Sequence, residues 1–89
     1  MKLELGKIVV TPGALEALTR DGKAPSDVIL RHRKGDWGDV AEENNHTNKK
    51  AVATNDSVLS SYPLRGTEKV WVITEGDRSV TTILLPEER

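Results

Sequence analysis

Two histidines are the residues of this chain whose types best suit acid–base chemistry. His32 and His46 titrate near neutral pH by default, so a proton transfer would use one of them. Structural interpretations compete with this one. His32 falls in a basic run at a predicted helix end, and His46 follows Glu42 by four residues, which suits a surface pair. A metal site would need both histidines and a carboxylate, which no spacing enforces, so we expect no metal.

A second polar group surrounds a predicted hairpin turn near the end of the chain. It consists of Glu75, Asp77, Arg78, Ser79, Thr81 and Thr82. As a structural turn, Glu75 pairs with Arg78 across it, and Asp77 or Ser79 bonds local backbone amides. As a binding site, Arg78 holds a phosphate or carboxylate while Thr82 or Ser79 orients it. Both interpretations stay open.

The loop from Gly35 to Asp39, GDWGD, places two glycines and a large indole between two predicted helices. Trp37 either fills the core between helix and sheet or, with the flanking carboxylates, forms a partner-binding edge. Asp39 is in addition the predicted N-cap of the helix that follows.

Breakers and caps predict the elements that position these residues. An apolar strand from Leu5 to Val10 ends at Thr11-Pro12-Gly13. Thr11 suits an N-cap and Pro12 the first helical position, so a short helix is expected over Pro12 to Arg20.

Two further helices are predicted before the chain changes its periodicity. The second begins in the stretch Ala24-Pro25-Ser26-Asp27 and closes at Gly35, with cations in its last turn. The third begins at Asp39 and runs to about Ala53; its surface is polar almost all round, which suits a solvated helix or a partner-binding face.

Three β-rich segments complete the chain, at Val58 to Leu64, Lys69 to Glu75 and Val80 to Leu85. The middle segment carries apolar side chains on both faces, which favours a central position. The predicted fold is α+β: an N-terminal strand, two to three short helices, and then a three-stranded antiparallel meander in one sheet packed by helices. The whole chain, 1–89, forms a single domain.

Composition restricts the classes of function. Thirteen basic and fourteen acidic residues give a net charge of −1, which argues against nucleic acid as a partner. The longest apolar run is too short to cross a membrane, no signal peptide is evident and cysteine is absent, so we expect a cytoplasmic protein. No catalytic triad, phosphate-binding loop or cofactor fingerprint occurs, and we expect no cofactor.

The segments RHRKGDWGDVAEENN and VWVITEGDRSVTTILLPEE resemble a family of short, uncharacterised bacterial proteins found mostly on plasmids and integrative elements. The resemblance covers nearly the whole chain. Its most specific parts are His32 with Gly35 to Asp39, Asn48, and Trp71 to Pro86. It implies a mobile-element context and a small self-contained fold. Some members are labelled as type I restriction modification subunits, but this chain lacks the Gly-rich loop and the Asn-Pro-Pro-aromatic motif of such methyltransferases.

These observations favour a non-enzymatic interaction module that modulates a host or element-encoded protein. The expected contact residues are Trp37, Asp39, His46 and Arg78. Such a module needs a protein partner, whose identity the sequence leaves open together with the oligomeric state.

Two alternatives belong to other classes of protein. A small metal-independent ribonuclease or toxin, similar in outline to the barnase, EndoU and RelE-like group, would use His32 as base, Arg78 as phosphate clamp and Glu75 or Thr82 as support. Sequence-specific DNA binding would rest on the basic run Arg31 to Lys34, which acidic residues follow closely.

Overall fold

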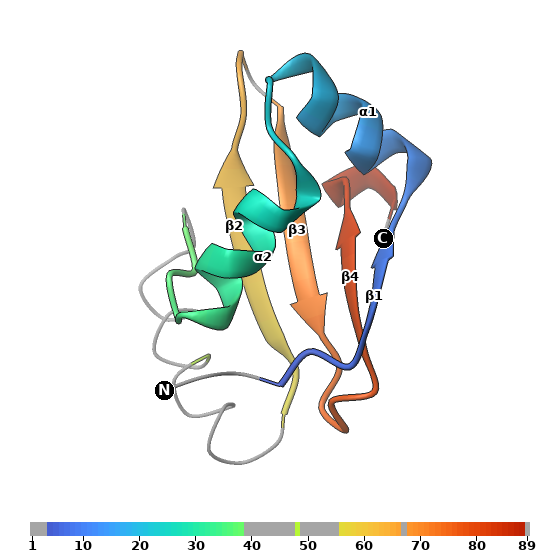
Figure 1. Cartoon of the computed structure of the whole chain (residues 1–89), viewed down its shortest axis with the longest axis vertical. Helices are drawn as coiled ribbons and strands as arrows, with labels where there is room; N and C mark the ends of the chain where they lie inside the picture. Colours follow the sequence, from blue (N-terminus) through green and yellow to red (C-terminus); the bar gives the residue numbers. More distant parts are fainter. Residues whose placement is uncertain (1–3, 39–47, 49–55, 67, 89) are drawn as a thin grey trace.

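In the described residues the chain forms a four-stranded sheet with two α-helices on one of its faces (Figure 1). This computed structural model describes residues 4–38, 48, 56–66 and 68–88. Its elements are β1 (Lys7–Val10), α1 (Pro12–Arg20), α2 (Pro25–Arg33), β2 (Val58–Pro63), β3 (Lys69–Thr74), β4 (Val80–Leu84) and the short 3₁₀-helix η1 (Pro86–Glu88). The helix predicted over residues 39–53 lies outside the described residues, apart from the helical Asn48.

The strand order across the sheet is β1-β4-β3-β2. Both β2 and β4 run antiparallel to β3, whereas β1 runs parallel to β4. The predicted α+β class is therefore confirmed. The three antiparallel strands β2, β3 and β4 do not make up the sheet by themselves, because β1 adds to β4 in parallel and gives a four-stranded mixed sheet. Periodicity predicts that a segment is a strand and carries no information on its partner, so the place of β1 was missed. The predicted central position of β3 is confirmed, because β3 lies between β2 and β4.

Local capping explains α1, which has the predicted bounds. Thr11 Oγ1 accepts a 3.1 Å hydrogen bond from the Ala14 amide, and Pro12 occupies the first turn, where its missing N–H costs nothing. The helix is followed by Gly22, whose φ of 71° is the left-handed conformation that glycine adopts readily.

A single acidic side chain fixes the start of α2. The Asp27 carboxylate accepts a 2.8 Å hydrogen bond from the Ala24 amide and adds negative charge at the positive end of the helix. Val28 and His32 lie four residues apart on one side of the helix, and both are buried. The position of His32 in the core thus follows from the same helical spacing that buries Val28.

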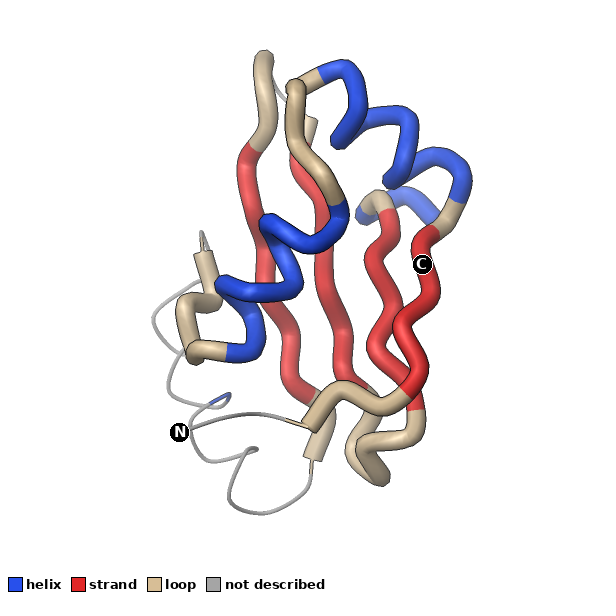
Figure 2. Tube along the Cα trace, in the orientation of Figure 1, coloured by secondary structure: helices blue, strands red, loops and turns tan. Residues whose placement is uncertain are grey.

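The two α-helices lie over one face of the sheet (Figure 2). The core lies between them and that face. Ala14, Ala17 and Leu18 of α1 and Val28 of α2 pack against alternate residues of the strands. The residues that meet them from the sheet and its loop are Tyr62, Leu64, Val70, Val72 and Ile83. Alternation places Trp71, Ile73 and Leu84 on the opposite face of the sheet.

Candidate functional site

Of the four predicted contact residues, Trp37 and Arg78 lie in the part of the chain that the structure describes. Asp39 and His46 lie outside the described residues. Trp37 is only 6% exposed, and its ring meets the His32 ring edge-on at 5.6 Å between centroids. The indole therefore packs in the interior, which agrees with the core interpretation of Trp37 and leaves little of it for a partner to contact.

Arg78 lies in the turn between β3 and β4, with a φ of 63°. Its guanidinium donates to the carbonyl oxygens of Asp56, at 2.8 Å, and of Glu75, at 3.2 Å. The predicted ion pair with the Glu75 carboxylate is thus replaced by bonds to backbone carbonyls. Asp77 accepts from the Ser79 amide at 2.9 Å, as the structural interpretation of this turn expects.

The base and the supporting hydroxyl proposed for the ribonuclease alternative, His32 and Thr82, do not come together. His32 is completely buried on the helix-covered face of the sheet, where it reaches Thr74. Thr82 lies on the opposite face, because it follows Thr81, which bonds Thr74 on the helix side. Glu75 is exposed at the end of β3. A base without solvent access, separated by the sheet from its supporting hydroxyl, lacks the geometry that proton transfer to a substrate requires.

Instead, His32 occupies the middle of a buried chain of hydrogen bonds between α2 and the sheet. Its Nδ1 contacts the Ser60 hydroxyl, and its Nε2 lies 2.8 Å from Thr74 Oγ1. Thr74 Oγ1 in turn lies 2.8 Å from Thr81 Oγ1, which donates to the Leu5 carbonyl oxygen at 2.7 Å. The three hydroxyls come from β2, β3 and β4, one from each strand.

The end of this chain fixes the direction of every proton in it. A carbonyl oxygen only accepts, so Thr81 must donate to Leu5, and Thr74 must then donate to Thr81. The His32 Nε2–H therefore donates to Thr74. In the neutral imidazole, this leaves Nδ1 as the acceptor for the Ser60 hydroxyl and specifies the tautomer.

Burial explains why this histidine remains neutral. Removal from water, with a smaller contribution from the positive charge of Arg78, lowers the pKa of His32 from 6.5 to about 4. At neutral pH the imidazole therefore acts as a polar link between α2 and three strands. The signal for this role is present in the sequence as a helical spacing of four from Val28 and as hydroxyls at inward-facing strand positions, but their meeting depends on the tertiary fold.

The outer edge of β2 is covered. Asn48 is 3% exposed, and its side-chain amide bonds both backbone groups of Leu59: Oδ1 accepts from the Leu59 N–H at 3.1 Å and Nδ2 donates to the Leu59 carbonyl. The next outward-facing amide, that of Ser61, donates to the Trp37 carbonyl at 3.0 Å. Gly38 forms an isolated parallel β-bridge with Ser61. The following outward position is Pro63, which has no N–H. No outward amide of this edge is left for a further strand.

Side chains of α2 and β2 hold the covering loop in place. Arg31 Nε donates to the Asp36 carboxylate at 2.7 Å, and this bond holds the pKa of Asp36 below its usual value. The Arg31 guanidinium lies 4.5 Å from the centre of the Tyr62 ring, and the Tyr62 hydroxyl donates to the Asp36 carbonyl at 2.6 Å. The described part of this loop, residues 35–38, is therefore held against β2.

The outer edge of β1 differs from that of β2. The Lys7 amide donates to the carbonyl oxygen of Ser79, just before β4, and the Thr11 amide donates to that of Ile83 in β4. Backbone groups alternate in direction along a strand, so those of Ile8 and Val10 point away from the sheet. Within the described residues no strand or side chain bonds them. Ile8 is 47% exposed and Val9 is 37% exposed, so the edge is both unpaired and apolar.

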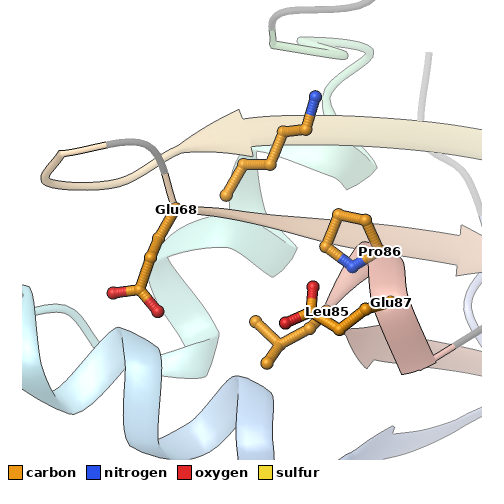
Figure 3. Close-up of a pocket in the computed structure, with 5 residues that line it drawn as sticks. Glu68, Leu85, Pro86 and Glu87 are labelled. Carbon is orange, nitrogen blue, oxygen red and sulfur yellow. The ribbon is translucent and has the colours of Figure 1, made fainter.

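A shallow hollow lies elsewhere, beside the start of β3 and the end of β4. Its volume is about 300 Å³, and it is lined by Glu68, Lys69, Leu85, Pro86 and Glu87. Glu68 lies on one side and Pro86 and Glu87 on the other (Figure 3). The Glu68 carboxylate is paired with Arg20 at 2.8 Å, so its charge is already balanced. The hollow contains none of the residues that the sequence singled out, and its size is at the lower limit of small-molecule sites.

Comparisons with protein-family models, curated proteins and solved structures found no match to this chain. In the described ranges, no cluster of three or more His, Cys, Asp or Glu side chains could hold a metal ion. Those same ranges contain no helix with the length and apolar character needed to cross a membrane. In the described residues, the open edge of β1 with exposed Ile8 and Val9 is the basis of the functional proposal that follows.

Proposed function

We propose that this chain is a small, non-enzymatic protein-interaction module of a mobile genetic element, working in the cytoplasm on a host or element-encoded protein. The observation that supports the proposal is the contrast between the two sheet edges. β2 is covered by Asn48 and by the Trp37–Gly38 segment, whereas β1 presents unpaired backbone groups beside exposed Ile8 and Val9. The mobile-element setting rests on the family resemblance alone.

The proposed mode of binding is strand addition. An extended segment of the partner lies along β1 and exchanges hydrogen bonds with the outward N–H and C=O groups of Ile8 and Val10. Main-chain bonds supply affinity for an extended strand of almost any sequence. Specificity then comes from the side chains that flank them: Ile8 on the helix-covered face of the sheet, and Val9 and Lys7 on the opposite face.

The burial of His32 is the reason for preferring this function to the ribonuclease alternative. Catalysis would need an accessible imidazole near Arg78 and a supporting group, but both ring nitrogens of His32 are engaged by Ser60 and Thr74. Strand addition requires no titrating group and uses surfaces that are exposed.

Ile8→Pro tests the proposal, because proline removes the outward N–H of residue 8 while the hydrogen bonds from β1 to β4 use the neighbouring positions. The matched control is Ile8→Thr, which keeps the N–H and a β-branched side chain. We expect both variants to fold, with thermal midpoints within a few degrees of each other. Each is then used with the original chain to capture proteins from a host extract.

The expected result is a partner captured by the original chain and by Ile8→Thr, and reduced about tenfold or more with Ile8→Pro. In the captured complex, one contiguous segment of the partner should gain amide protection, as an added strand does. If the folded Ile8→Pro variant captured as much partner as the original chain, the β1 edge would not be the binding element.

A further inference from the structure

Pairing of the β1 edge with a second copy of itself satisfies its outward groups without any other protein. The edge is unpaired over a short stretch. The outward position two residues before Ile8 is Gly6, whose φ of 63° is not extended, and the position two residues after Val10 is Pro12, where α1 begins. The outward residues of the strand are therefore Ile8 and Val10 alone.

One antiparallel register uses both residues of both copies. It places Ile8 of one copy opposite Val10 of the other, and Val10 opposite Ile8, so that each pair exchanges two backbone hydrogen bonds. Val9 then faces Val9 of the other copy on the two-fold axis. Pairing Ile8 with Ile8 would instead set Val10 against Gly6, and pairing Val10 with Val10 would set Ile8 against Pro12, which has no N–H.

We infer that β1 pairs antiparallel with β1 of a second copy about a two-fold axis at Val9, giving a continuous eight-stranded sheet. The inference rests on the open edge used in the proposed function. It puts β-branched pairs on both faces of the junction: Ile8 with Val10 on the helix side and Val9 with Val9 on the other. The helices of both copies then lie on the same face of the joined sheet.

The covered edge of β2 makes this assembly closed. If both edges of the sheet were open, copies would add at both sides and form open chains. Asn48, the Trp37 carbonyl and Pro63 leave β2 unable to accept a strand, so association through β1 stops at two copies. The chain's net charge of −1 opposes that association only weakly.

Self-pairing and partner binding compete, because both use the outward groups of Ile8 and Val10. A partner strand must displace the second copy before it can add to β1. The dimer is then the resting form of the module, and it protects an apolar edge that would otherwise promote aggregation.

Cysteine substitution tests the register, because the chain contains no cysteine and any disulfide must join two copies. At a non-hydrogen-bonded antiparallel pair the Cα atoms are about 4.5 Å apart, which a disulfide can span, so Val9→Cys should crosslink. Lys7→Cys is the matched control on the same face. Its two copies would lie four positions apart along the strand, roughly 13 Å, beyond disulfide reach.

Sedimentation of the full chain over micromolar to submillimolar concentrations measures the association itself. We expect a monomer–dimer equilibrium, with crosslinking of Val9→Cys at least about tenfold faster than that of Lys7→Cys. Ile8→Pro should raise the dissociation constant by about tenfold or more, and Ile8→Thr should change it much less.

Three results would overturn the inference: a monomer at every concentration, equal crosslinking at both cysteine positions, or assemblies that grow beyond two copies. Its failure can be told apart from failure of the proposed function. A monomer that still captures a partner in an Ile8→Pro-sensitive way removes the dimer and leaves the function standing. A dimer that forms as described, together with partner capture that Ile8→Pro does not reduce, would support the dimer and contradict the proposed function.

Discussion

His32 illustrates how a residue suited to proton transfer is used here for structure. Both of its nitrogens are bonded inside the fold, and the chain Ser60–His32–Thr74–Thr81 ends on the Leu5 carbonyl just before β1. Each bond strengthens its neighbours when all the donors point one way. The network therefore links α2, three strands and the segment that leads into β1.

The pH dependence of stability follows from this burial. The folded pKa of His32, about 4, lies below the unfolded value of 6.5, so the unfolded chain binds the proton more tightly. Stability is complete above pH 6.5 and is lost as the pH falls from 6.5 toward 4, by about 3 kcal/mol in all. Urea unfolding at intervals between pH 7.5 and 4.5 measures this loss.

His32→Gln is the control for that measurement, because it keeps a donor and an acceptor but does not titrate, while His46 remains. We expect a lower stability at neutral pH, by about 1–3 kcal/mol, and a nearly flat profile down to pH 4.5. The carboxylates with lowered pKa values, Asp21, Asp36, Asp77 and Glu88, lose their contributions only below this range. An equally steep profile in His32→Gln would show that another group causes the acid sensitivity.

Gly6 fixes the start of β1 by close backbone approach. A Cβ there would lie 2.4 Å from the carbonyl oxygens of both Arg78 and Ser79, whereas a Cβ at Gly22 would meet nothing within 4 Å. Both glycines have positive φ, so alanine carries a conformational cost at either position. We expect Gly6→Ala to destabilise the fold by at least about 2 kcal/mol and Gly22→Ala by about 1 kcal/mol, measured by denaturant unfolding. Equal effects would contradict the close approach at Gly6.

At the scale of elements, Asn48 acts as a substitute for a neighbouring strand. Its amide supplies one acceptor and one donor to Leu59, as a paired backbone residue would. Asn48→Ala should leave the Leu59 amide open to water and cost about 1–3 kcal/mol. Hydrogen exchange should then be faster at Leu59, while the Ser61 amide stays protected by the Trp37 carbonyl.

Asn48→Asp provides the matched comparison, since it retains the acceptor for the Leu59 amide and loses only the donor to the Leu59 carbonyl. The Leu59 amide should remain protected in this variant. If exchange at Leu59 were unchanged in Asn48→Ala, another group would have to cover this edge of β2.

Elements whose bounds are set by residues close in the sequence were predicted well. Thr11, Pro12 and Gly22 define α1 through local geometry, so its bounds could be predicted without knowledge of the fold. The position of β1 could not, because strand pairing with β4 joins residues more than seventy positions apart. The polar partners of His32 were missed for the same reason, since Ser60 and Thr74 meet it only in the folded chain.

The candidate site, the open edge of β1, could not be predicted from sequence patterns for a related reason. Ile8 and Val9 form an ordinary apolar strand by composition, and such a strand is buried when it lies inside a sheet. What exposes them is their place at the end of the order β1-β4-β3-β2. Trp37 showed the opposite outcome: a residue of the type common at interfaces lies in the interior against His32.

At the scale of the whole molecule, the sheet has two unlike edges. One is closed by a side-chain amide, a loop carbonyl and a proline, and the other is open where Ile8 and Val10 face outward. In the proposed function, this asymmetry directs association to a single side of the molecule. The proposed module would bind one strand at a time, from a partner or from a second copy, without forming fibres.

Amide hydrogen exchange at residues 8 to 10 tests this account most directly. In dilute solution, where copies separate, the Ile8 and Val10 amides should exchange at least about tenfold faster than the Val9 amide, which bonds β4. At high concentration, or with a captured partner, Ile8 and Val10 should become protected to a similar extent as Val9. Protection of Ile8 and Val10 already in the dilute monomer, or exposure that persists in every complex, would contradict the open edge of β1.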